Sequence, residues 1–140
     1  MISDAIKSID WAGTAYCLTG HICKVYFREP ARKGLEGLHY RVKNHSVIEL
    51  SPRVVNPDAM LMLFLHECGH ARLHFDDLKI HQSEPQPLSR PKHSEGHWQS
   101  PKITMREDDA ERLARKWYKF CRPQTTLEGK HRVLRSYYDV

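Results

Sequence analysis

Two histidines and a glutamate stand at a spacing that suits metal chemistry. The stretch His66-Glu67-Cys68-Gly69-His70 places the two imidazoles four residues apart. On an α-helix, side chains at i and i+4 lie one above the other, so His66 and His70 can ligate one ion. Glu67 then lies beside that ion, where its carboxylate can take a proton from a water. Two ligands and a general base form the H-E-x-x-H arrangement of metal-assisted hydrolysis.

A catalytic zinc needs a third protein ligand and keeps a fourth position for water. The metzincin pattern would supply a third histidine after a glycine turn, but Leu73 and Asp76 occupy those two positions. His74 lies one turn beyond His70 on the same helix. It is too far along the axis to share an ion with His66, so we expect it behind the ligands or at the surface.

A carboxylate from a second helix is the remaining source of a ligand, as in gluzincins. The downstream helix predicted over 104–121 carries the acidic run Glu107-Asp108-Asp109-Ala110-Glu111. Glu107 lies at the edge of the apolar stripe of that helix, beside small alanines, so it should point at the neighbouring helix. We predict Glu107 as the third ligand, with Asp109 as the alternative. Glu107 also fits a capping box with Thr104, and Glu111 could orient a ligating histidine from behind.

The motif has to lie inside a real helix, and the residues before it predict one. Asn56-Pro57-Asp58 combines a capping side chain, a proline suited to the first helical position and an acid at the positive end of the dipole. We expect this helix to run from Pro57 to about Phe75. It is apolar on most sides, which is typical of a central buried helix, and Cys68 should pack there as a small apolar residue.

The segments before this helix indicate a small sheet. An amphipathic pattern predicts a helix over residues 3–19 that ends at Gly20. Short β-rich runs follow at 24–28, 38–42 and 46–50, and Asn44 in the tight connection 43–45 tolerates positive φ. The expected fold is α+β. A three-stranded antiparallel sheet would pack on the helix of the histidine motif and on the second helix that carries a ligand.

Composition sets the broad class. The chain has 140 residues and a net charge of +5, which predicts one domain over residues 1–121. No apolar run reaches the length of a membrane span, no signal peptide is visible, and the four cysteines read as reduced thiols of a cytoplasmic protein. The positive charge fits solubility or an acidic partner. Nucleic acid stays open as a partner, although no nucleic-acid motif accompanies the charge.

Two segments fall outside the predicted elements. The proline-rich stretch from about 76 to 102 reads as an inserted exposed loop with solvated His81, His93 and His97. Glycine, serine and proline around His93 and His97 argue against a second metal site there. Residues 122–140 form a basic C-terminal tail. Tyr137, Tyr138 and His131 in that tail are candidates for the group that stabilises an oxyanion.

The two motif regions resemble those of a known family. His66-Glu-Cys-Gly-His-Ala-Arg-Leu-His74 resembles the H-E-L-G-H-x-x-x-H helix of the ImmA/IrrE-type metallopeptidases, and Glu107–Ala114 resembles their E-x-E-A-N-x-F-A helix. The resemblance covers roughly residues 20 to 121. It implies a compact zincin-like fold, a Zn²⁺ ion held by His66, His70 and an acid of the second helix, and Glu67 as the base.

The resemblance also implies a partner class. Family members are intracellular proteases, and several cut or inactivate helix-turn-helix repressors. This chain departs from the family pattern at Cys68, Asp109, Glu111 and Leu113, where the family has Leu, Glu, Asn and Phe. The sequence thus predicts a zinc-dependent intracellular metallopeptidase that acts on a regulatory or repressor protein. Three alternatives stay open: a non-catalytic zinc-containing binding module, a SprT-like DNA-associated protease, and two core histidines that bind no metal.

Overall fold

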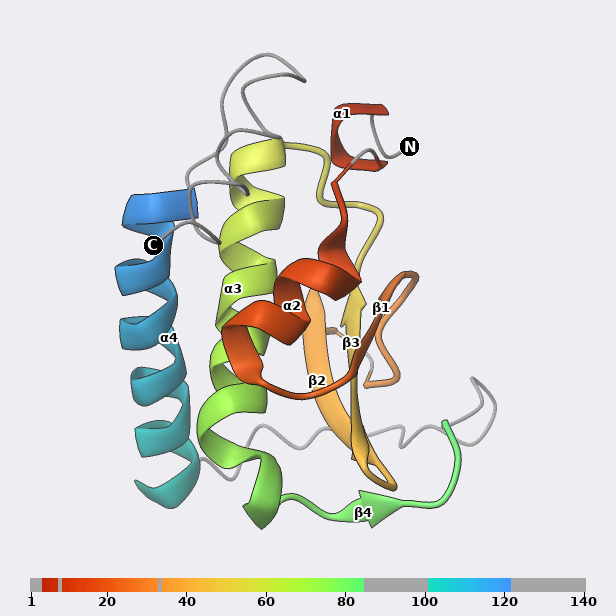
Figure 1. Cartoon of the computed structure of the whole chain (residues 1–140), viewed down its shortest axis with the longest axis vertical. Coiled ribbons are helices and arrows are strands. Elements are labelled where there is room, and N and C mark those ends of the chain that lie inside the picture. Colours follow the sequence, from red (N-terminus) through yellow and green to blue (C-terminus); the bar gives the residue numbers. More distant parts are fainter. Residues whose placement is uncertain (1–3, 8, 33, 85–100, 122–140) are drawn as a thin grey trace.

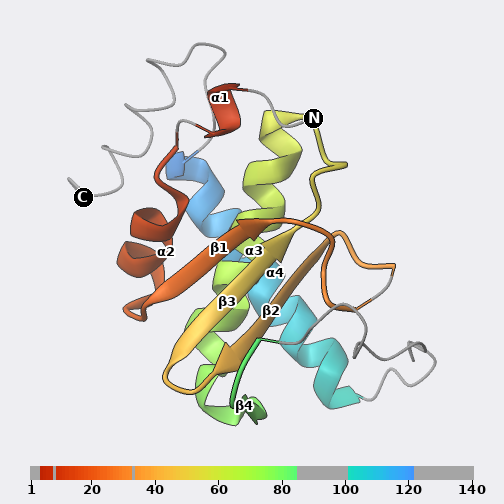
Figure 2. The same ribbon diagram turned by 90° about the vertical axis from the view of Figure 1, so that its right-hand side faces the viewer.

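A twisted sheet, a central helix and an outer helix form three successive layers (Figures 1 and 2). The computed structural model describes residues 4–7, 9–32, 34–84 and 101–121. In chain order the elements are α1 (Asp4–Lys7), α2 (Trp11–Thr19), β1 (Cys23–Phe27), β2 (Gly37–Val42), β3 (His45–Leu50), α3 (Pro57–His74), the 3₁₀ turn η1 (Phe75–Asp77), β4 (Ile80–His81) and α4 (Pro101–Cys121). Helix α3 lies against the sheet, and α4 packs on the side of α3 that faces away from it.

The α+β class is confirmed, but the sheet is mixed and has four strands in the order β1-β3-β2-β4. Strands β2 and β3 form the expected antiparallel hairpin. Strand β1 lies next to β3 instead of β2, so the two strands run parallel, from Cys23 opposite Ser46 to Phe27 opposite Leu50. The prediction of a three-stranded antiparallel sheet was therefore wrong. The connection after β1 is long enough to carry the chain past β3 to the far side of the sheet.

Strand β4 was missed because it lies in the segment predicted to be a loop. Its two residues pair in parallel with the end of β2, where Arg41 faces Ile80 and Val42 faces His81. The adjacent turn also differs from the prediction in detail. Lys43, not Asn44, adopts the positive φ of the hairpin, at 53°. Residues 85–100, the rest of the predicted loop, lie outside the described residues, as does the tail 122–140.

Helix α3 begins and ends as the sequence predicts. The Asn56 side chain accepts hydrogen bonds from the backbone N–H groups of Asp58 and Ala59, at 2.8 and 3.0 Å. The inner face of α3 packs against Trp11 of α2. The ring of Trp11 meets that of Phe64 edge-on, with 4.8 Å between the ring centroids. Cys68 is fully buried in this core, as expected. Among the described helices, none combines the length and the hydropathy that a bilayer crossing needs.

The two other predicted helices differ at their N-terminal ends. The helix expected over 3–19 is divided into α1 and α2, because the Asp10 side chain caps a new start by accepting a hydrogen bond from the Gly13 N–H at 2.9 Å. Gly20 closes α2 in the left-handed conformation, as predicted, with φ 78°. Helix α4 begins at Pro101, ahead of the expected start near Thr104.

The sheet face turned away from α3 holds a buried carboxylate. Glu49 of β3 is fully buried, and its Oε2 accepts hydrogen bonds from the Arg28 Nε at 2.7 Å and from the Tyr40 hydroxyl at 2.9 Å. The Arg28 guanidinium also donates to Glu84 Oε1 at 2.9 Å, just after β4. Arg28, which follows β1, thus connects this end of the sheet both to Glu49 of β3 and to Glu84 in the segment after β4.

Removing Arg28 should destabilise the fold. Arg28→Met leaves the buried Glu49 charge with fewer partners, which should lower the free energy of unfolding by about 3 kcal/mol. Arg53→Met is the matched control, because the Arg53–Glu29 pair is exposed on both sides. That change should cost less than about 1 kcal/mol. Urea denaturation of both variants measures the difference, and equal losses would contradict the role given to Arg28.

Candidate metal centre

His66 and His70 of α3 and Glu107 of α4 converge on one point. The Nε2 atom of His66 lies 2.9 Å from Glu107 Oε1, and the Nε2 atom of His70 lies 3.0 Å from Glu107 Oε2. One donor atom from each residue falls within 4.8 Å of the other two, so the three could hold a metal ion. The two rings lie one turn apart on the helix and meet edge to face, with centroids 4.9 Å apart.

The spacing of these donors suits a small divalent ion. Zinc binds imidazole nitrogen and carboxylate oxygen at about 2.0–2.2 Å, so ligand atoms around a tetrahedral ion lie about 3.3 Å apart. The two nitrogen–oxygen distances of 2.9 and 3.0 Å are a few tenths of an ångström shorter. Small side-chain movements would therefore admit an ion, and a His₂Glu donor set is one that catalytic zinc uses.

The other nitrogen of each imidazole also has a partner. His66 Nδ1 lies 2.9 Å from Glu111 Oε1, and the second oxygen of Glu111 accepts from Arg115 Nε at 3.0 Å. His70 Nδ1 lies 3.1 Å from Nδ1 of the buried His74. Partners of this kind fix the orientation of a ligating ring and which of its nitrogens carries the proton. Glu111 and His74 thus lie behind the two histidines, in the places proposed for them.

The structure does not fit the two alternatives considered for the third ligand: Asp109 in place of Glu107, and a capping role for Glu107. Asp109 forms an exposed ion pair with Arg112 at 3.1 Å and is not part of the three-residue group. A capping role for Glu107 does not fit either, because α4 begins at Pro101 and Glu107 lies well inside it. The three candidates for stabilising an oxyanion, Tyr137, Tyr138 and His131, lie outside the described residues, as do His93 and His97, where the sequence argues against a metal site.

A glycine allows the two helices to approach closely enough for this convergence. A Cβ atom added at Gly69 would lie 2.7 Å from the carbonyl oxygen and 3.0 Å from the Cα of Ala110. Ala110 and Ala114 are both fully buried in the same contact. Glu107 lies one turn before Ala110, so this contact sets the distance between its carboxylate and the two imidazoles. The alanines were noted from sequence, whereas the role of Gly69 became visible only in three dimensions.

Burial and neighbouring charges shift the pKa values of three residues of the site. Burial by itself would lower the pKa of His66, but hydrogen bonds to Glu107 and Glu111 and the nearby charge of Glu67 raise that pKa to about 9. Hydrogen bonds from His66 and His70 hold the pKa of Glu107 well below its usual range. Burial raises the pKa of Glu67 to about 7, against the opposing charges of His70 and His66.

Glu67 is buried beside the three-residue group and borders a cavity. The cavity has a volume of about 790 Å³. It is lined by Gly34, Leu35, Glu36, Gly37, Arg53, Ala59, Met62, Leu63, His66, Glu67 and Glu111. A Cβ atom added at Gly37, the first residue of β2, would lie 2.7 Å from Leu63 Cδ1 and 3.1 Å from Glu67 Oε2. The absence of a side chain at Gly37 therefore leaves room for the Glu67 carboxylate, a role that the sequence did not reveal.

Comparison with protein-family models, with curated proteins and with solved structures finds no match for this chain.

Adding a side chain at position 69 should destabilise the protein and weaken zinc binding. Gly69→Ala would push α3 and α4 apart, which should destabilise the protein by about 1–3 kcal/mol even though alanine favours helix formation. Displacing Glu107 should also weaken zinc binding by roughly tenfold or more. Thermal denaturation and competition with a zinc chelator measure the two effects. A more stable variant with unchanged zinc affinity would disprove the close contact.

Zinc binding should release a proton from His66. At pH 8 its imidazole is mostly protonated, since its pKa is about 9, yet a ligand nitrogen has to be neutral. We expect about one proton released per zinc, and an apparent affinity that rises about tenfold per pH unit up to about pH 9. Calorimetry in buffers of different ionisation enthalpy counts the protons. Glu111→Gln should reduce the number, because it removes one of the groups that raise this pKa; release of no proton by the unaltered protein would contradict the assignment.

Proposed function

We propose that this chain is a zinc-dependent peptidase of the ImmA/IrrE type with a zincin-like fold. One observation carries the proposal. Two imidazole nitrogens of α3 meet both oxygens of a single carboxylate from α4, and a buried glutamate follows the first histidine. Within a single group, these residues offer three protein ligands for the ion and a base beside it.

His66, His70 and Glu107 would hold the zinc ion, which would supply Lewis-acid chemistry by polarising a peptide carbonyl and lowering the pKa of a water toward about 7. The chain supplies the proton transfers. Glu67 accepts the proton of the attacking water and returns it to the leaving amine, which is general base and then general acid catalysis. Without an ion, burial raises the pKa of Glu67 to about 7. The positive charge of a bound ion would lower this pKa and favour the ionised carboxylate that a general base needs.

The surroundings of Glu67 favour an extended polypeptide as substrate. The adjoining cavity of about 790 Å³ is large enough for several atoms of a chain on either side of a peptide bond. Among the described strands, β4 pairs only with Arg41 and Val42, so the outer edge of β2 from Gly37 to Tyr40 has no strand partner. An extended peptide that adds to this edge would pass Gly37 and hence the Glu67 carboxylate.

The nature of the protein substrate follows from the resemblance alone. Several ImmA/IrrE-type enzymes act on helix-turn-helix repressors, and a repressor or related regulatory protein is accordingly the partner that we propose. Cleavage would most simply occur in an extended linker of such a regulator, because a folded helix cannot pair with a strand edge.

Replacing the base should separate metal binding from catalysis. Glu67→Gln keeps the size of the side chain but cannot accept a proton, so cleavage should fall by about 10²–10⁴-fold. Zinc content should stay at the level of the unaltered protein, whereas His66→Ala should lose the metal. Cleavage of a library of internally quenched peptides and metal analysis by mass spectrometry give the two readouts.

Two results would overturn the proposal. Undiminished cleavage by Glu67→Gln would exclude this residue as the base. Stoichiometric zinc in the unaltered protein, with no cleavage of any library peptide or helix-turn-helix repressor, would favour the binding module instead.

A further inference from the structure

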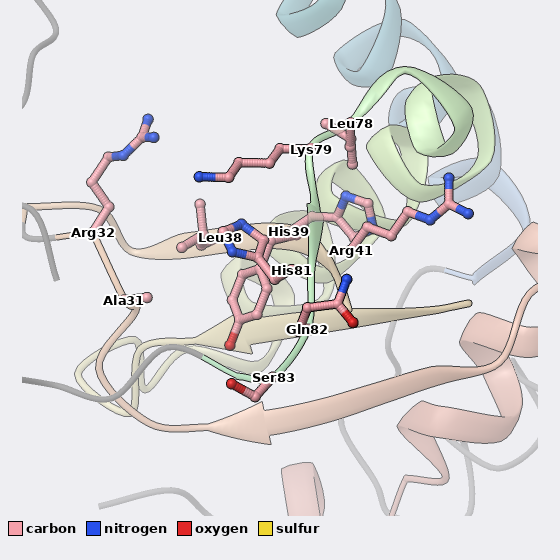
Figure 3. Close-up of a pocket in the computed structure, with 11 residues that line it drawn as sticks. Ala31, Arg32, Leu38, His39, Arg41, Leu78, Lys79, His81, Gln82 and Ser83 are labelled. Atoms are coloured by element: carbon pink, nitrogen blue, oxygen red, sulfur yellow. The ribbon is translucent and has the colours of Figure 1, made fainter. Parts of the chain in front are cut away.

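A second cavity lies farther along β2, where the chain after η1 crosses the strand. Its volume is about 660 Å³. The side chains that matter here are those of Arg32, Leu38, His39, Arg41, Lys79 and His81. Figure 3 shows the segment from Leu78 to Ser83 crossing β2, with Lys79 extended toward Leu38. We call this cavity the basic pocket.

The basic pocket gathers positive charge without acidic partners. Its lining residues include three strong cations, Arg32, Arg41 and Lys79, and no carboxylate. Arg32 and Lys79 are exposed, and neither forms an ion pair with an acid in the described part of the chain. Positive charges without acidic partners favour an anionic ligand, which they also attract over a distance.

Arg41 contributes charge from a fixed position. Its Nε donates to the Lys43 carbonyl at 2.8 Å, and its guanidinium lies over the ring of Phe75 at 4.2 Å. Both contacts hold the side chain in place, and neither involves a carboxylate. Figure 3 shows the guanidinium on the side of the pocket away from Arg32 and Lys79, so those two residues supply the charge on the near side.

The two cavities border consecutive residues of one strand. Gly37 lines the cavity beside Glu67, and Leu38 and His39 line the basic pocket. Residues along a strand are about 3.3 Å apart, so an extended chain on the edge of β2 would reach both cavities within a few residues. A free inorganic anion would fill little of a pocket of this size, whereas an acidic side chain would enter it together with its backbone.

We propose that the basic pocket binds the carboxylate of an acidic residue in the substrate, and so selects peptides with Glu or Asp a few residues from the scissile bond. This inference rests on the proposed peptidase function. Arg32 and Lys79 attract the carboxylate from the rim of the pocket.

Binding without turnover tests the proposal. The zinc-loaded Glu67→Gln protein is titrated into fluorescein-labelled decapeptides of neutral sequence, each with a single Glu at a successive position, and into the same set with Gln. We expect Glu to improve affinity about tenfold at one or two adjacent positions, measured by fluorescence anisotropy at low salt. The preference should fall below twofold when Arg32→Gln and Lys79→Gln are added.

A matched control removes the same charge elsewhere. Arg112→Gln with Lys116→Gln takes two exposed cations from α4, outside the pocket, and should leave the Glu preference intact. Equal affinity for all Glu and Gln peptides, no measurable binding of any peptide, or a preference that survives loss of Arg32 and Lys79 would overturn the assignment. Binding of inorganic phosphate without discrimination among the peptides would overturn it in favour of a free anion.

Cleavage by the unaltered protein is assayed in parallel. A retained Glu preference without any cleavage would remove the peptidase proposal and leave the pocket assignment standing. Cleavage without a Glu preference would support the peptidase proposal and overturn the assignment of the basic pocket.

Discussion

The contact between Gly69 and Ala110 is the constraint on which the candidate metal centre depends. Neither ligand helix can form the site by itself, because α3 carries only two of the three donors and α4 carries the third. A larger side chain at residue 69 would clash with the backbone of Ala110, push the two helices apart and so move Glu107 away from the two histidines. A glycine facing an alanine brings the backbones into contact, with the Ala110 carbonyl oxygen 2.7 Å from where a Cβ of residue 69 would be. The chemistry of the site is thus set by two residues that take no part in it.

The parts of this structure that could be predicted from sequence are governed by local rules. Asn56 and Pro57 mark the start of α3 because capping is a matter of neighbouring backbone groups. The histidine spacing follows from helix geometry, and the position of Glu107 follows from the apolar stripe of α4. Hence the three residues that could hold a metal ion, within the described part of the chain, are the three that the sequence predicted as ligands. Each inference needed only the periodicity of one helix and a guess that the two helices pack together.

The parts that could not be predicted depend on contacts between distant segments. The pattern of β1 shows that it is a strand, but not that it pairs with β3 in parallel instead of with β2. Strand β4 has only two residues, too few for a pattern, and it exists because the chain passes the end of β2. Gly37 could not be recognised either, because its role depends on the Glu67 carboxylate, which is distant in sequence and lies beside it in the fold. Pairing order and close approach are properties of the assembled fold, and a single sequence does not encode them in any local signal.

The layered arrangement has a consequence for how an ion would influence the whole protein. Helix α4 packs chiefly on α3 and belongs to the outermost layer, so it has less to hold it in place than the sheet or the central helix. An ion shared between the two helices would act as a staple across their interface. Its binding free energy would then add to the stability of the folded state by mass action. Chelation of that ion would loosen the outer helix first, and the three-residue group would come apart there while the sheet remained folded.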